Sequence, residues 1–97
     1  MDRLVNIGFG NMVNTGHVIA VVSPDSAPSR RIVQTARDAG RVIDATQGRK
    51  TRSLLVMEGG QVVLSALQPE TVAARYNGKD LQGSAAGLDE ETENEEA

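Results

Sequence analysis

The sequence divides into two parts of opposite charge, and this division limits how much of the chain can fold. Residues 1–76 carry nine basic and six acidic side chains, whereas residues 77–97 carry one basic and seven acidic side chains. The second part has only two leucines among its acids, so it cannot bury enough apolar surface to offset the entropy lost on ordering. We therefore expect one folded domain, residues 1–77, followed by a disordered acidic tail, residues 78–97.

Five short strands and two helices are predicted in the folded part. The strands are expected at residues 3–9, 17–22, 41–46, 51–57 and 61–67, and the helices at residues 27–39 and 69–77. Ser26 is a suitable N-cap for the first helix, and Pro28 fits its first turn. Gly59 and Gly60 predict a two-residue hairpin turn between the last two strands. The expected fold class is α+β, with one small, mostly antiparallel sheet and two helices.

Two of the expected strands have continuous rather than alternating apolar residues. Residues 17–22 (HVIAVV) and 54–57 (LLVM) are typical of strands that are buried on both faces. Two short helices cannot cover both faces of a five-stranded sheet, and a chain this small buries only about 60% of its unfolded surface. We therefore expect a second copy of the chain to supply the missing cover, which predicts a homo-oligomer.

Composition excludes several classes of site. The chain has no cysteine and one histidine, so disulfide scaffolds, Cys-ligated metals and His clusters for zinc are excluded. No apolar run approaches the roughly 18 residues of a membrane span, and a cytoplasmic protein is expected. Phe9 and Tyr76 are the only aromatic residues, too few for a base-stacking surface. No acid–base pair or activated nucleophile is recognisable, so we expect no enzyme activity, cofactor, metal or small-molecule substrate.

The strongest local signal is a basic loop at residues 48–52 (GRKTR). Arg49, Lys50 and Arg52 supply cations that suit phosphate oxygens, and an arginine can also bind a guanine edge with two hydrogen bonds. Gly48 lets the backbone approach a partner closely. This pattern favours a DNA contact loop, and the alternative is an ordinary solvated turn.

A weaker basic signal lies on the first predicted helix and just beyond it. Its members are Arg30, Arg31, Arg37 and Arg41. They are interpreted as a solvated face, as an addition to a basic surface, or as ion-pair partners of Asp38 or a neighbouring subunit. The solvated face is the favoured interpretation.

Longer stretches of the chain resemble a known family. They are NIGFGN (residues 6–11), SPDSAPSRR (23–31), ARD-x-G (36–40), IDAT-x-GRKTR (43–52) and LSALQPETVAAR (64–75). Together they resemble the RemA family of bacterial regulators of extracellular-matrix genes. The match runs almost continuously from Leu4 to Arg75 and leaves the acidic tail outside.

The resemblance implies a DNA-binding transcription regulator that activates extracellular-matrix (biofilm) genes. It implies subunits similar to the LytTR type of DNA-binding domain, assembled into a ring with double-stranded DNA around the outside. The basic loop of the family corresponds to residues 48–52, so Gly48, Arg49, Lys50 and Arg52 take the DNA-contact role. The family arginine before the second strand corresponds to His17, where a neutral histidine would weaken a phosphate contact.

One alternative function from a different class stays open. It is a non-enzymatic structural or protein-interaction module whose basic loop docks an acidic protein partner.

Overall fold

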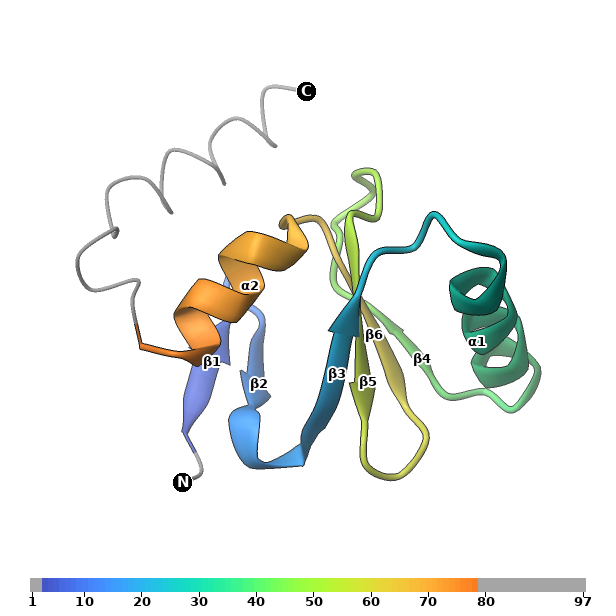
Figure 1. Cartoon of the computed structure of the whole chain (residues 1–97), viewed down its shortest axis with the longest axis horizontal. Helices are drawn as coiled ribbons and strands as arrows, with labels where there is room; N and C mark the ends of the chain where they lie inside the picture. The colour runs from blue at the N-terminus through green and yellow to red at the C-terminus, as the bar shows by residue number, and fades with distance from the viewer. Residues whose placement is uncertain (1–2, 79–97) are drawn as a thin grey trace.

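The computed structural model describes residues 3–78, and this part of the chain has the predicted α+β fold (Figure 1). Its elements, in chain order, are β1 (Leu4–Asn6), β2 (Met12–Asn14), the 3₁₀ turn η1 (Thr15–His17), β3 (Val18–Val22), α1 (Ala27–Asp38), β4 (Val42–Asp44), β5 (Ser53–Met57), β6 (Val62–Ser65) and α2 (Pro69–Tyr76). The predicted acidic tail, apart from Gly78, lies outside the described residues.

The strands form two sheets rather than the single sheet that was expected. A four-stranded sheet has the order β3-β5-β6-β4, in which β4 and β6 are parallel and the other neighbours are antiparallel. β1 and β2 form a separate antiparallel hairpin. The prediction of five strands therefore missed β2, which lies between the first two predicted strands.

A tight turn at residues 8–10 creates this hairpin. Gly8, Phe9 and Gly10 have φ angles of 112°, 57° and 78°, so three consecutive residues adopt the left-handed half of φ space. The Ile7 N–H donates to the Asn11 carbonyl at 2.8 Å and closes the turn. Glycine adopts positive φ at no steric cost, which explains how two glycines flank the one strained aromatic residue.

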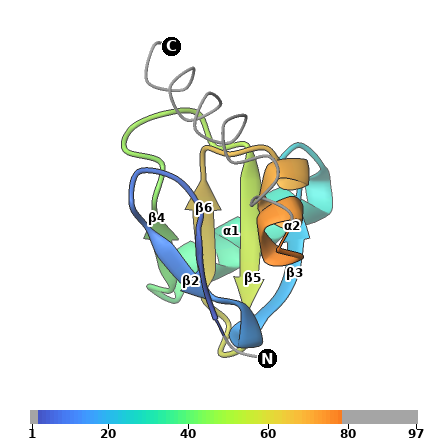
Figure 2. The same cartoon turned by 90° about the vertical axis from the view of Figure 1, so that its left-hand side faces the viewer.

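Elements of the same chain lie on both faces of the four-stranded sheet. Figure 2 shows α2 and the β1–β2 hairpin in front of the sheet and α1 behind it. Leu54 and Leu64 pack with Ala36 on the α1 side, whereas Leu55 and Val63 pack on the α2 and hairpin side. The hairpin, which the sequence did not reveal, thus supplies part of the cover that was expected from a second subunit.

The two edge strands of this sheet expose large apolar side chains. Ile19 on β3 is 65% exposed, and Ile43 on β4 is 53% exposed. The continuous apolar run of β3 is thus only partly buried. Apolar surface on the edge strands therefore remains available for contact between subunits.

Side-chain hydrogen bonds attach α2 and β6 to the β1–β2 hairpin. Arg75, which is 7% exposed, donates from Nη1 to the Asn6 carbonyl at 3.0 Å. Arg3 donates from Nη2 to the Arg75 carbonyl at 2.7 Å, and Ser65 Oγ donates to the Ile7 carbonyl at 2.8 Å. These bonds give partners to backbone carbonyls at the joint between the hairpin and the rest of the fold.

Of the local predictions, the helix cap is confirmed and the length of the hairpin turn is wrong. Ser26 caps α1 as predicted, since its Oγ accepts from the Ser29 N–H at 3.1 Å. The Met57 N–H donates to the Gln61 carbonyl at 2.9 Å, so the β5–β6 hairpin closes on a loop of three residues, 58–60, rather than on a two-residue turn. Gly60 has a positive φ of 90°, while Gly59 does not. A type I turn followed by one left-handed residue is the usual solution for this loop length.

Candidate nucleic-acid interface

The basic loop begins in a tight, strongly specified turn. Gln47 and Gly48 have φ angles of 55° and 80°, and the Arg49 N–H donates to the Thr46 carbonyl at 3.0 Å. Two consecutive residues with positive φ, enclosed by a hydrogen bond between the residues on either side of them, define a type I′ turn. The turn gives Arg49 a fixed starting direction, so less conformational entropy is lost when this segment binds a partner.

Asp44 anchors the base of this turn. Its carboxylate Oδ1 accepts from the Thr46 hydroxyl at 2.6 Å and from the Thr46 N–H at 2.9 Å. The pKa of Asp44 lies below its ordinary value, chiefly because of the bond from the Thr46 hydroxyl and next because of the bond from the Thr46 N–H. The more distant Arg37 charge also lowers this pKa, whereas burial of the carboxylate raises it. Thr46 is 2% exposed, so the turn is attached to the core.

Three cations follow the turn. Lys50 is exposed, and Arg49 and Arg52 are half-buried. The Arg52 N–H donates to the Ser65 carbonyl at 2.8 Å, which fixes the far end of the loop to β6. None of these three side chains forms an ion pair with a carboxylate of residues 3–78. Their charge is therefore available to an anionic partner.

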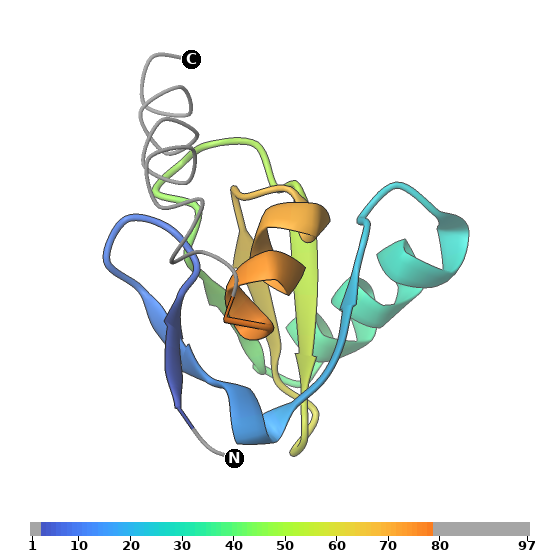
Figure 3. The ribbon, with the colours of Figure 1, turned by 60° about the vertical axis from the view of Figure 1, so that its left-hand side comes forward.

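The hairpin turn at residues 8–10 lies at the same end of the molecule as the basic loop (Figure 3). Asn11 Nδ2 donates to the Gly8 carbonyl at 3.0 Å and, more weakly, to the Ala45 carbonyl at 3.4 Å. Asn11 therefore makes the hairpin a neighbour of the loop base. Sequence reasoning missed this neighbour because the two segments are far apart in the chain.

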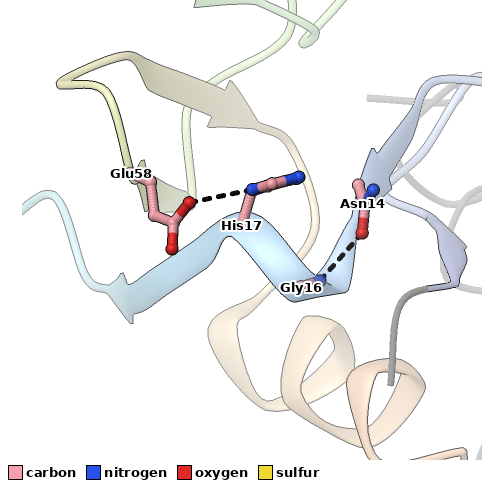
Figure 4. A network of polar contacts seen from close by, with 4 residues as sticks. All are labelled: Asn14, Gly16, His17 and Glu58. Atoms are coloured by element: carbon pink, nitrogen blue, oxygen red, sulfur yellow. Dashed lines mark hydrogen bonds and ion pairs between the residues drawn. The ribbon is translucent and has the colours of Figure 1, made fainter.

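His17 lies at the opposite end of the sheet. The basic loop enters β5, whereas His17 lies beside Glu58, just after β5 ends. Its Nδ1 is 2.9 Å from Glu58 Oε1, and nearby Asn14 accepts from the Gly16 N–H (Figure 4). Five strand residues, about 17 Å, separate the two places. One subunit therefore does not bring His17 together with residues 48–52.

Arginines of α1 approach the basic loop. Arg30 and Arg37 line a hollow of about 320 Å³ that Thr51 also lines. Arg31 and Arg41 instead line a different hollow, of about 630 Å³, together with Val56. All four arginines are exposed, as the favoured interpretation of a solvated face requires. The alternative of ion pairs with Asp38 is not found within residues 3–78.

Neither a metal site nor a membrane-spanning helix has a candidate among the described residues. Within residues 3–78, no group of three or more His, Asp or Glu side chains is placed to hold a metal ion. No helix in that same range is long and apolar enough to cross a membrane. The prominent chemical feature is the cationic end built from the loop and its turn.

These observations define a class: a small α+β protein with a cationic surface. A family described as "RemA-like: Extracellular matrix regulatory protein A-like" matches residues 4–76. The chain belongs to the RemA-like family, and the resemblance inferred from the sequence is confirmed.

Individual relatives agree with this assignment. A protein of Synechococcus sp. (strain JA-2-3B'a(2-13)) named "Putative regulatory protein" is 54% identical over 91 residues, covering 94% of this chain and 97% of the relative. A protein of Lachnoclostridium phytofermentans with the same name is 55% identical over 80 residues, covering 82% of this chain and 88% of the relative. A regulatory role is thus supported.

Proposed function

We propose that the chain is a homo-oligomeric regulator of transcription that binds double-stranded DNA through residues 48–52 and activates extracellular-matrix genes. The observation that carries the proposal is the set of three loop cations on a fixed turn, without a carboxylate partner in residues 3–78, in a chain of this family. Phosphate oxygens are the natural partners of such cations.

The loop contributes affinity more than sequence preference. Arg49, Lys50 and Arg52 neutralise backbone phosphates and release counterions, which is a sequence-independent contribution. The attachment of Thr46 to Asp44 and of Arg52 to Ser65 keeps the loop in one conformation before binding. Only an arginine that reaches a guanine edge would add preference for a base.

Assembly of many subunits makes such a small contact sufficient. One short loop gives weak binding, whereas several loops on one particle raise the effective concentration of each successive contact. Ile19 and Ile43 occupy opposite edges of the four-stranded sheet. A contact between these different edges is head-to-tail, and head-to-tail contacts close into rings when the rotation allows it.

His17 is a minor DNA contact in this proposal. It is more than half exposed, but the Glu58 carboxylate beside it competes with phosphate for the imidazole. Because His17 lies far from its own loop, it meets DNA only where the duplex passes the opposite end of the sheet. His17→Arg should then add about one phosphate contact per engaged subunit, and an unchanged salt dependence would remove His17 from the interface.

The DNA contact is tested by gel shift on unrelated duplexes over a salt series. Arg49→Ala and Lys50→Ala should each reduce the slope of log K against log salt by about 0.9 per engaged subunit. Because each substitution acts at every subunit, binding should collapse while the elution volume stays unchanged. Normal DNA binding by both variants would remove the loop from the mechanism and favour docking of an acidic protein partner.

Assembly is tested independently by light scattering on the purified chain. The measured mass should be several times the 10.3 kDa of one chain. Ile19→Lys and Ile43→Lys should lower it, because each places a charge in an apolar edge contact. A clean monomer at micromolar concentration would contradict the ring.

A further inference from the structure

A hollow between α1 and the start of β5 joins two basic features that are distant in the chain. Arg30, Gln34 and Arg37 line it from α1, and Thr51 lines it from the basic loop. The buried side chains Leu54 and Leu64 complete its lining. The hollow, of about 320 Å³, is open to solvent beside the basic loop.

The spacing of the α1 residues gives this hollow a linear polar rim. Arg30, Gln34 and Arg37 occupy positions i, i+4 and i+7, so they form one stripe along the helix. Arg30 and Arg37 are about 10 Å apart along the helix axis. B-DNA carries one phosphate per 3.4 Å of axis on each strand, so the stripe matches a short run of phosphates.

Neither arginine forms a direct ion pair with a nearby carboxylate of residues 3–78, although Arg37 acts on Asp44 from a longer distance. Gln34 Nε2 donates to Asp38 Oδ1 at 2.8 Å, so this carboxylate is held by a neutral amide. The Asp44 carboxylate accepts from its own turn, as described above. Arg30 Nη1 donates to the backbone carbonyl of Asp25 at 3.1 Å. Neither arginine pairs with a carboxylate in the part of the chain that the structure describes.

We propose that Arg30, Arg37 and the Thr51 hydroxyl bind backbone phosphates of DNA, so that the DNA contact surface continues from the basic loop onto α1. This inference rests on the proposed function and extends its site to a second element. Two guanidinium groups and a hydroxyl supply several donors to phosphate oxygens and no acceptor that would select a base. The helix contact therefore positions the duplex against the loop.

The experiment measures DNA affinity over a salt series for Arg30→Gln and Arg37→Gln in the full chain. The matched control is Arg31→Gln, which makes the same charge change on the same helix but lines the hollow on the other side. Arg30→Gln and Arg37→Gln should each lower the slope of log K against log salt by about 0.9 per engaged subunit. Arg31→Gln should have a clearly smaller effect, most visibly at high salt, where long-range attraction is screened.

A second variant distinguishes a role of the Arg37 charge from a purely structural role of its side chain. Arg37→Lys keeps the positive charge and should retain most of the wild-type slope, whereas a purely structural role of Arg37 would make both variants weaken binding alike. Slopes of Arg30→Gln and Arg37→Gln equal to that of Arg31→Gln, with Arg49→Ala still defective, would overturn this inference alone. A wild-type chain that binds no DNA would overturn the proposed function and this inference together.

Discussion

Ser53 and Ser65 are cross-strand partners on β5 and β6, and both are fully buried, but their hydroxyls have different surroundings. Ser65 Oγ donates to the Ile7 carbonyl and accepts from the Leu67 N–H at 3.1 Å. Ser53 Oγ has no hydrogen-bond partner among the described residues. The Ser65 hydroxyl thus connects the hairpin to the entry of α2, whereas the Ser53 hydroxyl connects nothing.

The first prediction compares these two serines. Ser65→Ala should lower the free energy of unfolding by about 1–3 kcal/mol, because it leaves a buried carbonyl and a buried N–H unpaired. Ser53→Ala should change it by less than about 0.5 kcal/mol. Urea unfolding at one protein concentration measures both. Equal losses would show that the volume at these positions matters more than the hydrogen bonds.

The second prediction concerns Asp44 and acid stability. Its pKa is lower in the folded chain than in the unfolded chain, chiefly because Thr46 donates to the carboxylate. The stabilisation is therefore complete above the ordinary aspartate pKa of about 4 and is lost as pH falls through the lower folded value. Asp44→Ala should be destabilised at pH 7, and its difference from the wild type should narrow toward pH 3.

The control for this prediction is Thr46→Val, which removes the hydroxyl donor and keeps the side-chain shape. In this background, the pH-dependent part of the Asp44→Ala effect should be smaller. Denaturant unfolding between pH 3 and pH 7 measures it. A constant difference across that range would mean that the carboxylate charge contributes nothing to the turn.

At the scale of elements, the type I′ turn before the basic loop holds a residue that such turns disfavour. Gln47 carries a side chain at a φ of 55°, where asparagine or glycine is preferred. The third prediction is that Gln47→Asn raises the free energy of unfolding by about 0.5–1 kcal/mol and preserves DNA binding. Gly48→Ala should instead lower it by about 1–2 kcal/mol, since its φ is 80°.

Urea unfolding and gel shift on both variants measure these effects. Stabilisation of the chain by Gly48→Ala would contradict the turn assignment. A loss of DNA binding in Gln47→Asn, with unfolding as expected, would show that the Gln47 side chain itself takes part in binding.

At the scale of the whole molecule, residues 79–97 bring a net charge of −6 to a chain whose proposed interface is cationic. The fourth prediction is that removal of these residues raises DNA affinity, and does so more at low salt. Screening acts over about 8 Å at physiological ionic strength and over longer distances at low ionic strength. Competition between the acidic segment and DNA for Arg49 and Lys50 is therefore strongest in dilute salt.

The matched control keeps the length of this segment and replaces its Asp and Glu residues by Asn and Gln. If charge is the cause, this variant should bind DNA as tightly as the truncated chain in a gel-shift salt series. Truncation without any gain in affinity would exclude competition with DNA. A role in docking a partner would then be the next hypothesis to test.

Local patterns determined most of the individual elements. The apolar runs predicted β3, β5 and β6. The Ser26 cap predicted the start of α1, and the predicted end of this helix is within one residue of the observed end. Such patterns report which side chains are buried and which φ angles are needed, and both are properties of a few neighbouring residues. The cationic character of residues 48–52 is local in the same way.

Spatial neighbours were decided by the tertiary structure alone. The three residues of β2 carry too little periodicity to be recognised, so its pairing with β1 was missed, and so was the cover that this hairpin gives the sheet. Strand pairing then placed His17 at one end of β5 and the basic loop at the other. Packing of α1 brought Arg30 and Arg37 to Thr51. These proximities depend on contacts between distant segments, and neither composition nor spacing in the sequence encodes them directly.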